Sequence, residues 1–192
     1  MTDGVDTDEA LMLRFASGDV HAFEELYRRH ELRVWRYLQR SLGNRAIADE
    51  LMQDVWFTVA RTARGYRPIA RFTTWLLTLA HNRLVDALRT SRRHVHVSAV
   101  AGGSDGLSII EQLAADGRTE PAEGAQSQQD AAAVLAAIDQ LPPEQRQVFL
   151  LHAEGELKLE EIARVTCTNF ETAKSRLRYA RSKLRQLLQE YA

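Results

Sequence analysis

Apolar side chains recur at steps of three and four residues along most of this 192-residue chain, and no other feature constrains the fold as strongly. One run shows this spacing clearly: Phe23, Leu26, Tyr27, His30, Val34 and Leu38. Such a step matches the turn of an α-helix, so the pattern predicts helices that each bury one stripe. No stretch of useful length alternates in the way a half-buried β-strand does. The chain is therefore predicted to be all-α.

Breaks in this period divide the chain. Gly43-Asn44, and then Gly65 with Pro68, separate three predicted helices in the first half. From about residue 98 to 128, glycine, proline and acidic residues replace the helical pattern, which is typical of a flexible linker. We predict two small helical domains joined by this acidic linker: a tail (1–9), a first domain (10–95), the linker (96–129) and a second domain (130–192).

The second domain is predicted to contain a helix-turn-helix. A short helix over 159–165 precedes a turn and a long helix that begins at Phe170. Ala163 supplies the small residue that two crossing helices need, and Ala173 supplies the inner face of the second helix. Basic side chains on the outer face can reach phosphates and guanine edges. DNA binding is the favoured interpretation; the alternative is a basic helix that only packs or binds a protein.

Charge is distributed unevenly, although the formal net charge is -1. Six arginines lie between residues 28 and 45, against the single acid Glu31. Residues 172–189 hold six basic residues and no acid. Residues 94–140, which include the predicted linker, hold seven acids against Arg118 alone. Two basic blocks around an acidic stretch favour nucleic-acid contact.

Motifs in both domains, taken in order, resemble those of bacterial sigma factors. In the second domain, LPPEQRQVFL at 141–150 and TAKSRL at 172–177 resemble the fourth conserved region. In the first domain, AFEELY at 22–27, LMQDVW at 51–56 and FTTWL at 72–76 resemble the second region. The chain is thus similar to the extracytoplasmic-function (ECF) group, which keeps only these two regions.

This resemblance implies a subunit that binds core RNA polymerase and directs promoter-specific transcription initiation, without catalysis, metal or cofactor. The implied partners are the polymerase core, through the clamp of its largest subunit, and promoter DNA. Such subunits are commonly held inactive by an anti-sigma protein, which is a further candidate partner. No run approaches the roughly 18 apolar residues that span a membrane, and the N-terminus lacks a basic-then-apolar signal. We therefore expect a cytoplasmic protein without membrane insertion.

The resemblance also assigns three sites. The polymerase-binding helix places carboxylates beside apolar residues: Asp49, Glu50, Leu51, Gln53 and Asp54. Opening the -10 element needs cations and a pocket or flat side chains that capture an unstacked base: Tyr66, Arg67, Arg71, Phe72, Trp75, His81, Asn82 and Arg89. The -35 element is assigned to the start of the last helix: Phe170, Glu171, Thr172, Lys174, Ser175, Arg176 and Arg178. Trp75 also fits a core position.

The turn of the helix-turn-helix departs from the family pattern. A glycine is usual there, because glycine tolerates a left-handed backbone, but this chain has Cys167. As the lone cysteine, Cys167 cannot form an internal disulfide. We expect a buried, unreactive thiol rather than a redox-active one.

Two other functions stay open at the level of sequence. One is a DNA-binding regulator that does not engage the polymerase. The other is a sigma-like decoy that binds polymerase or an anti-sigma protein without using promoters. The sequence holds no Gly-rich phosphate loop, no His-Glu-x-x-His and no Gly-x-Ser-x-Gly motif, so an enzyme is not expected.

Overall fold

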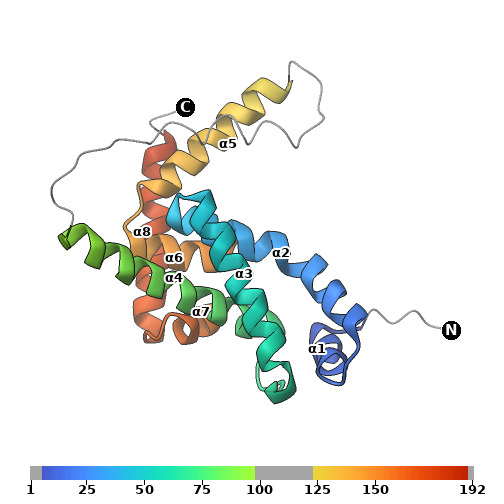
Figure 1. Cartoon of the computed structure of the whole chain (residues 1–192). Helices are drawn as coiled ribbons and strands as arrows, with labels where there is room; N and C mark the ends of the chain where they lie inside the picture. Colours follow the sequence, from blue (N-terminus) through green and yellow to red (C-terminus); the bar gives the residue numbers. More distant parts are fainter. Residues whose placement is uncertain (1–5, 98–122, 190–192) are drawn as a thin grey trace.

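The computed structural model describes the backbone of residues 6–97 and 123–189, and side chains within 6–90 and 131–189. All regular secondary structure in these ranges is helical, which confirms the predicted class. The first domain contains α1 (Asp8–Ala16), α2 (Val20–Leu42), α3 (Arg45–Thr62), a 3-10 turn η1 (Ala63–Gly65) and α4 (Phe72–Val97). The second domain contains α5 (Glu123–Asp139), α6 (Pro143–Ala153), α7 (Leu159–Val165) and α8 (Phe170–Gln189) (Figure 1).

Local hydrogen bonds explain where α2 and α3 begin and end. The side chain of Asp19 starts α2 by accepting a hydrogen bond from the backbone N–H of His21 at 3.1 Å. Gly43 ends this helix with φ 66°, a left-handed conformation that favours glycine. Asn44 then starts α3 by accepting from the N–H of Ile47 at 3.1 Å. The break predicted at Gly43-Asn44 is confirmed.

The core of the first domain lies between α2, α3 and α4, and α1 packs against α2. Each helix contributes one stripe of buried side chains, as the period predicts. These include Leu26, Val34 and Leu38 of α2, Val55 and Val59 of α3, and Leu76, Leu77 and Leu84 of α4. Truncating one such leucine to alanine costs about 2–5 kcal/mol in a well-packed core.

The end of the predicted acidic tail (1–9) is part of the fold. Asp8 and Glu9 form the first turn of α1. Asp8 accepts a hydrogen bond from Arg29 of α2 at 2.9 Å. Glu9 accepts a hydrogen bond of 2.6 Å from the backbone N–H of Phe72, the first residue of α4. These two carboxylates therefore join α1 to α2 and α4.

The second domain is built around the predicted helix-turn-helix. Ala163 of α7 is 7% exposed and Ala173 of α8 is fully buried, so the two helices cross closely as expected. Asn169 starts α8 by accepting a hydrogen bond from the N–H of Thr172 at 2.7 Å. α5 and α6 pack against α8 and complete the domain.

The two domains lie in contact, with α6 beside α2 and α7 beside α4 (Figure 1). Gly155, between α6 and α7, is buried at this interface. A Cβ atom added there would lie 2.4 Å from the carbonyl oxygen of Leu151 and 2.7 Å from Cδ1 of Leu77. The α6–α7 connection therefore approaches α4 closely enough to require glycine.

The predicted acidic linker lies mostly outside the described residues, between 98 and 122. The backbones of α4 and α5 extend into its predicted ends. Within the described ranges, no helix has both the length and the apolar character needed to cross a membrane.

Candidate functional surfaces

The outer face of α3 carries four exposed side chains spaced three or four positions apart: Glu50, Gln53, Asp54 and Phe57. Residues with this spacing share one face of a helix, so two carboxylates, an amide and a phenyl ring form a single surface. We call it the α3 strip. Leu51, which was predicted in the same site, points into the core and is 8% exposed.

Sequence reasoning missed Phe57, which is 68% exposed. A signal for it was present, because Phe57 follows Gln53 by four positions and Asp54 by three. Its ring adds apolar area to a face whose other three exposed side chains are polar.

Asp49 differs from the other predicted acids because it already has partners. Trp35 of α2 donates a hydrogen bond from Nε1 to Asp49 Oδ1 at 2.7 Å. Nε of Arg45 lies 3.8 Å from the other carboxylate oxygen. The carboxylate of Asp49 is therefore held against α2, and it borders the α3 strip instead of projecting from it.

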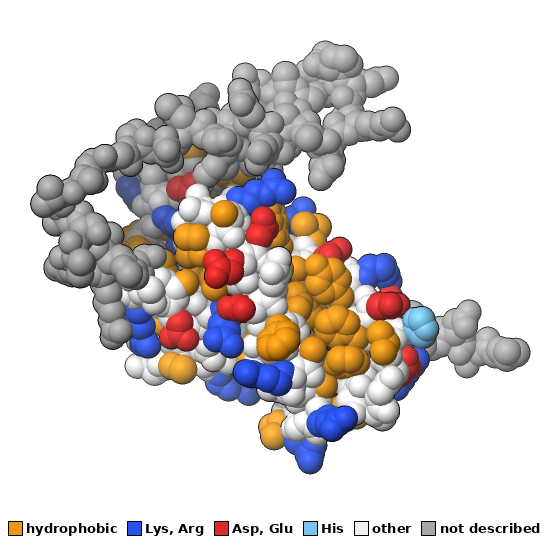
Figure 2. Space-filling model, viewed as in Figure 1, with side chains coloured by type: hydrophobic (Ala, Val, Ile, Leu, Met, Phe, Trp, Pro, Cys, Tyr) orange, Lys and Arg blue, Asp and Glu red, His pale blue; other side chains and the backbone are white. Residues whose placement is uncertain are grey.

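Aromatic rings from α1, α2 and α3 form a cluster next to the strip. The ring centroids of Phe15 and Phe23 are 4.8 Å apart, and those of Phe23 and Trp56 are 5.7 Å apart. Tyr27, which is 37% exposed, lies 4.9 Å from Trp56. Hydrophobic side chains gather on this side of the first domain (Figure 2). Exposed patches of this kind mark contact surfaces in soluble proteins.

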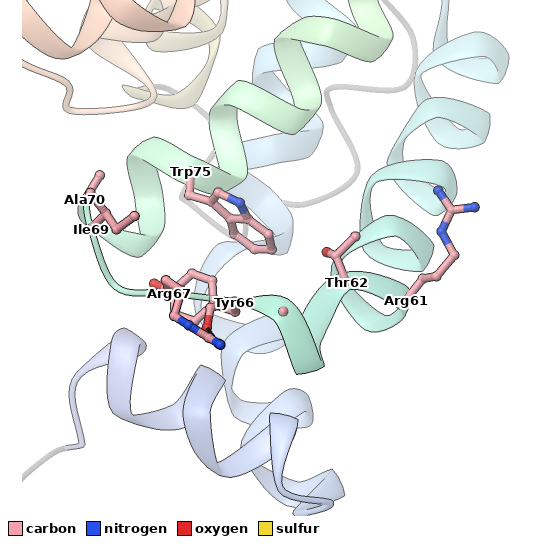
Figure 3. Close-up of a pocket in the computed structure, with 8 residues that line it drawn as sticks. Arg61, Thr62, Tyr66, Arg67, Ile69, Ala70 and Trp75 are labelled. Carbon is pink, nitrogen blue, oxygen red and sulfur yellow. Dashed lines mark hydrogen bonds between the residues drawn. The ribbon is translucent and has the colours of Figure 1, made fainter.

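A pocket of about 620 Å³ opens where η1 leads into α4 (Figure 3). Its lining combines two aromatic rings, two guanidinium groups and smaller side chains: Arg61, Thr62, Tyr66, Arg67, Ile69 and Trp75. The rings of Tyr66 and Trp75 meet edge to face, with centroids 5.1 Å apart. Trp75 is half-buried, so its ring contributes to the pocket as well as to packing.

Tyr66 forms a rigid part of this wall. It is 4% exposed, and burial, reinforced by the negative charges of Glu9 and Asp8, raises the pKa of its hydroxyl to about 12. The hydroxyl therefore stays protonated near neutral pH. Arg67 remains exposed and donates a hydrogen bond to the carbonyl oxygen of Tyr66 at 3.0 Å.

One face of α4 continues from the pocket. Arg71 precedes the helix, and Trp75, Asn82 and Arg89 follow at steps of four, seven and seven, which places all four on one side. Arg71, Asn82 and Arg89 are exposed. We call these four residues the α4 face. The structure thus brings together most of the residues predicted for the -10 element.

Two residues of that prediction lie in the core instead. Phe72 is fully buried, with its ring centroid 5.3 Å from that of His30. His81 is 6% exposed, and its Nδ1 lies 2.8 Å from the hydroxyl oxygen of Tyr37. Burial lowers the pKa of His81 to about 4, so the ring is neutral near pH 7. Both support the α4 face from beneath, and we do not retain them as DNA contacts.

The first turns of α8 expose four of the seven residues predicted for the -35 element: Phe170, Glu171, Lys174 and Arg178. Lys174 Nζ lies 3.7 Å from a carboxylate oxygen of Glu171 and 5.9 Å from the centroid of the Phe170 ring. A groove of about 440 Å³ beside this turn is lined by Lys174, Arg178, Arg181 and Arg185 over Leu159 and Leu177. We call the four exposed residues the α8 face.

The other three residues of the -35 prediction are half-buried. The hydroxyl of Ser175 donates to the carbonyl oxygen of Thr172 at 3.0 Å, within the helix itself. Arg176 forms an ion pair with Glu144 of α6, and its side chain is 24% exposed. Arg176 therefore holds α8 against α6 and does not project with Lys174.

Cys167 occupies the turn with φ 51°, in the left-handed region that favours glycine. The expectation of a buried thiol is wrong: Cys167 is exposed. Cys167 is the second of the four residues (166–169) that link α7 to α8, and the neighbouring backbone N–H of Thr168 donates to the carbonyl oxygen of Ala163 at 2.9 Å. In the parts of the chain described here, no three His, Cys, Asp or Glu side chains cluster closely enough to hold a metal ion.

Comparison with known proteins agrees with this arrangement. The family model for Sigma-70 region 2 matches residues 26–94, and that for Sigma-70, region 4 matches residues 131–184. RNA polymerase sigma factor CarQ of Myxococcus xanthus is 34% identical, over 93% of this chain and 96% of CarQ. ECF RNA polymerase sigma factor RpoE of Cereibacter sphaeroides is 32% identical, over 97% of this chain and 98% of its own length.

Two solved structures share the fold. CnrH, in complex with the cytosolic domain of CnrY, aligns with a TM-score of 0.68 at 22% identity, covering 97% of this chain and all of CnrH. Sigma factor RpoE of Bartonella quintana, in complex with the anti-sigma factor NepR, aligns with a TM-score of 0.67 at 20% identity, covering 86% and 98%. The chain therefore belongs to the ECF sigma factors of the sigma-70 family, which direct RNA polymerase in transcription initiation and are not enzymes.

Proposed function

We propose that three separate surfaces of this sigma factor carry out its three binding steps. The α3 strip binds the clamp of the largest polymerase subunit. The pocket and the α4 face capture and open the -10 element. The α8 face reads the -35 element as duplex DNA. The observation that carries the proposal is the pocket beside an exposed, arginine-bearing helix face, since a flipped base needs the pocket and its backbone needs the cations.

For polymerase binding, the α3 strip offers two kinds of contact. Glu50 and Asp54 attract basic residues of a partner, which steers association and sets register. Phe57 and the neighbouring aromatic cluster bury apolar area, which is the main source of affinity in protein interfaces.

For opening the -10 element, the half-buried ring of Trp75, held edge to face by Tyr66, provides an apolar surface on which an unstacked base can lie. Arg61 and Arg67 at the pocket neutralise phosphates of the separated strand. Asn82, farther along the α4 face, has both a donor and an acceptor and can bond to a base edge.

For the -35 element, Lys174 and Arg178 project from the first turns of α8 and can donate to guanine edges or phosphates in the major groove. Glu171 can accept from a cytosine amino group. Arg181 and Arg185 lie farther along the same side and suit phosphate contacts. In this proposal the first domain (10–95) binds the polymerase and opens the -10 element. The second domain (130–192) recognises the -35 element.

We also propose a cytoplasmic location, where polymerase and promoters are found, and an anti-sigma protein as a regulatory partner. Support for the partner comes from sigma factor RpoE of Bartonella quintana, which was solved in complex with the anti-sigma factor NepR. A partner of this kind would compete with polymerase for the α3 strip and the aromatic cluster.

Separate assays for binding to core polymerase and for strand opening test whether different surfaces carry out these two steps. Asp54→Asn should weaken binding to core polymerase roughly tenfold through loss of a rim charge, without changing duplex -35 binding.

Asn82→Ala should reduce permanganate reactivity of the -10 thymines while core and -35 binding persist. Lys183→Ala, an exposed change on α8 away from the α8 face, is the control. Equal losses in all assays for Asn82→Ala would contradict the role given to the α4 face.

A further inference from the structure

Ile69 is the most exposed large hydrophobic side chain in the described part of the chain, at 92%. It lies in the loop between η1 and α4, and the sequence prediction for the -10 element did not include it. A single exposed aliphatic residue is common on protein surfaces, so exposure alone does not define a site. The backbone, the charges and the pocket around Ile69 distinguish it from such residues.

The loop presents Ile69 to solvent between two buried anchors. Tyr66, before it, is 4% exposed, and Phe72, after it, is fully buried. The backbone N–H of Ile69 donates to the carbonyl oxygen of Arg67 at 2.8 Å, which closes a three-residue turn centred on Pro68. The proline ring fixes its own φ and so limits the turn further. Because the backbone is already constrained, little entropy is lost when a partner covers the side chain.

The charges around Ile69 favour nucleic acid as that partner. Residues 61–71 contain no acid and four arginines, all of them exposed: Arg61, Arg64, Arg67 and Arg71. Glu161 of α7 approaches one of these, with Oε2 3.9 Å from Nη1 of Arg71. DNA combines an anionic backbone with apolar base faces, so it matches an aliphatic side chain that is set among cations.

Ile69 also lines the pocket of about 620 Å³ that Tyr66 and Trp75 border. It lies on the bend of the loop, across the pocket from Arg61 (Figure 3). A base that turns into this pocket leaves a gap in the stack of the duplex, and apolar base faces border the gap. Apolar side chains, isoleucine among them, insert between base steps and unstack them. Ile69 is therefore placed beside the base that leaves the stack, where the gap forms.

We propose that Ile69 is a wedge. When a base of the -10 element enters the pocket, the Ile69 side chain fills the gap in the stack, rests on the base pair that stays closed and keeps the two strands apart. This inference rests on the proposed function of the pocket and adds a residue that acts on the duplex and not on the captured base. The side chain is covered only in the opened duplex, so it favours the open state over the closed one.

Holoenzyme assembled from purified bacterial core polymerase and the full chain tests the wedge on a promoter fragment from which the parent protein starts transcription. Ile69→Thr keeps the branched Cβ but has less apolar surface and carries a hydroxyl. It should lower the ratio of open to closed complexes roughly tenfold, which corresponds to about 1.4 kcal/mol. Permanganate reactivity of the -10 thymines measures this ratio. Ile69→Leu, which keeps the apolar surface, should stay near the parent.

A single-stranded oligonucleotide with the -10 sequence separates the wedge from the pocket. It can place a base in the pocket, but it has no closed base pair on which Ile69 can rest. Holoenzyme with Ile69→Thr should therefore bind it as tightly as the parent does, whereas Asn82→Ala, which removes a proposed base contact, should bind it more weakly. Leu32→Gln removes another exposed aliphatic side chain, on α2, and is the control that should change neither measurement.

Two results would overturn the wedge and leave the pocket in place. One is unchanged opening by Ile69→Thr. The other is an equal loss on the fragment and on the oligonucleotide, which would place Ile69 against the captured base or a protein partner. A matching loss in Leu32→Gln would also overturn the wedge, because any exposed apolar side chain would then have the same effect.

The wedge and the proposed function fail together if the parent holoenzyme opens no promoter fragment. Misfolding is a separate matter, and thermal unfolding monitors it for each variant. Because Ile69 is 92% exposed, neither of its replacements should change the unfolding temperature.

Discussion

At the scale of single residues, burial separates the side chains that can reach a partner from those that hold the fold. The helical period correctly places Asn82 and Arg89 on one exposed face of α4, because residues seven positions apart lie on the same side of a helix. It cannot show that Arg176 pairs with Glu144, thirty-two positions earlier, since this contact depends on how α6 crosses α8. Nor could it show that His81 is bonded to Tyr37.

The buried His81 predicts a pH dependence of stability. The unfolded chain takes up a proton on this residue below about pH 6.5, whereas the folded protein, with its pKa lowered to about 4, does not. Stability is therefore lost as the pH falls from about 6.5 to 4, and at pH 5 the loss is about 2 kcal/mol. Urea unfolding at pH 7 and pH 5 should show this extra loss in the parent protein but not in His81→Gln. The pKa of His30 is also lowered, but His30 is present in both proteins and cancels. Equal losses would contradict the assignment.

Lys174 and Arg176 are neighbours in sequence but have different expected effects. Lys174→Ala should weaken binding to a -35 duplex by about 1–3 kcal/mol and leave the free energy of unfolding unchanged. Arg176→Ala should lower the free energy of unfolding by about 0.5–1 kcal/mol, because its pair with Glu144 is partly exposed. Fluorescence anisotropy and urea unfolding measure the two effects. The reverse pattern would mean that Arg176, and not Lys174, faces the DNA.

At the scale of elements, the apolar period predicts the helices well and their ends less well. The breaks at Gly43-Asn44 and before α4 follow from turn chemistry that is visible in the sequence. The sequence predicts an acidic tail over residues 1–9, but Asp8 and Glu9 form the first turn of α1 and contact α2 and α4. Such contacts carry no signal in local composition.

Glu9 is expected to stabilise the start of α4. Its carboxylate accepts the N–H of Phe72, which no residue of the preceding loop satisfies in the same way. Glu9→Ala should lower the free energy of unfolding by about 1 kcal/mol, the usual effect of losing a helix cap, whereas Glu9→Gln keeps an acceptor and should lose less. Thermal unfolding measures both. Glu24→Ala, an exposed change on α2, is the control. No difference between the alanine and glutamine variants would exclude the capping role.

The turn between α7 and α8 carries a conformational cost that glycine would relieve. Cys167 has φ 51°, which is unfavourable for a residue with a side chain. Cys167→Gly should raise the free energy of unfolding by about 0.5–1 kcal/mol, because the gain in the folded turn exceeds the added freedom of the unfolded chain. Cys167→Ala, which keeps the Cβ, should change little. A destabilised glycine variant would show that the thiol itself contributes to the turn.

At the scale of the whole molecule, the sequence indicates two helical domains and the order of their tasks, but not how the domains sit against each other. The interface consists of pairs such as Arg40 with Glu154 and Thr74 with Glu161, which are far apart in sequence and belong to no motif. The basic block over residues 28–45 favours nucleic-acid contact by its charge, yet Arg33 and Arg40 of that block pair with glutamates of the second domain. Charge patterning locates surfaces and cannot by itself name what they bind.

Run-off transcription with purified bacterial core polymerase, with and without this protein, on a library of promoter fragments tests the central claim most directly. The proposed surfaces predict discrete start sites that appear only when the protein is present, preceded by shared -35 and -10 elements. They also predict that Asp54→Asn weakens these transcripts and that Lys183→Ala does not. The same transcripts with and without the protein, although it is folded and bound to core polymerase, would contradict promoter-specific initiation and leave a polymerase-binding decoy.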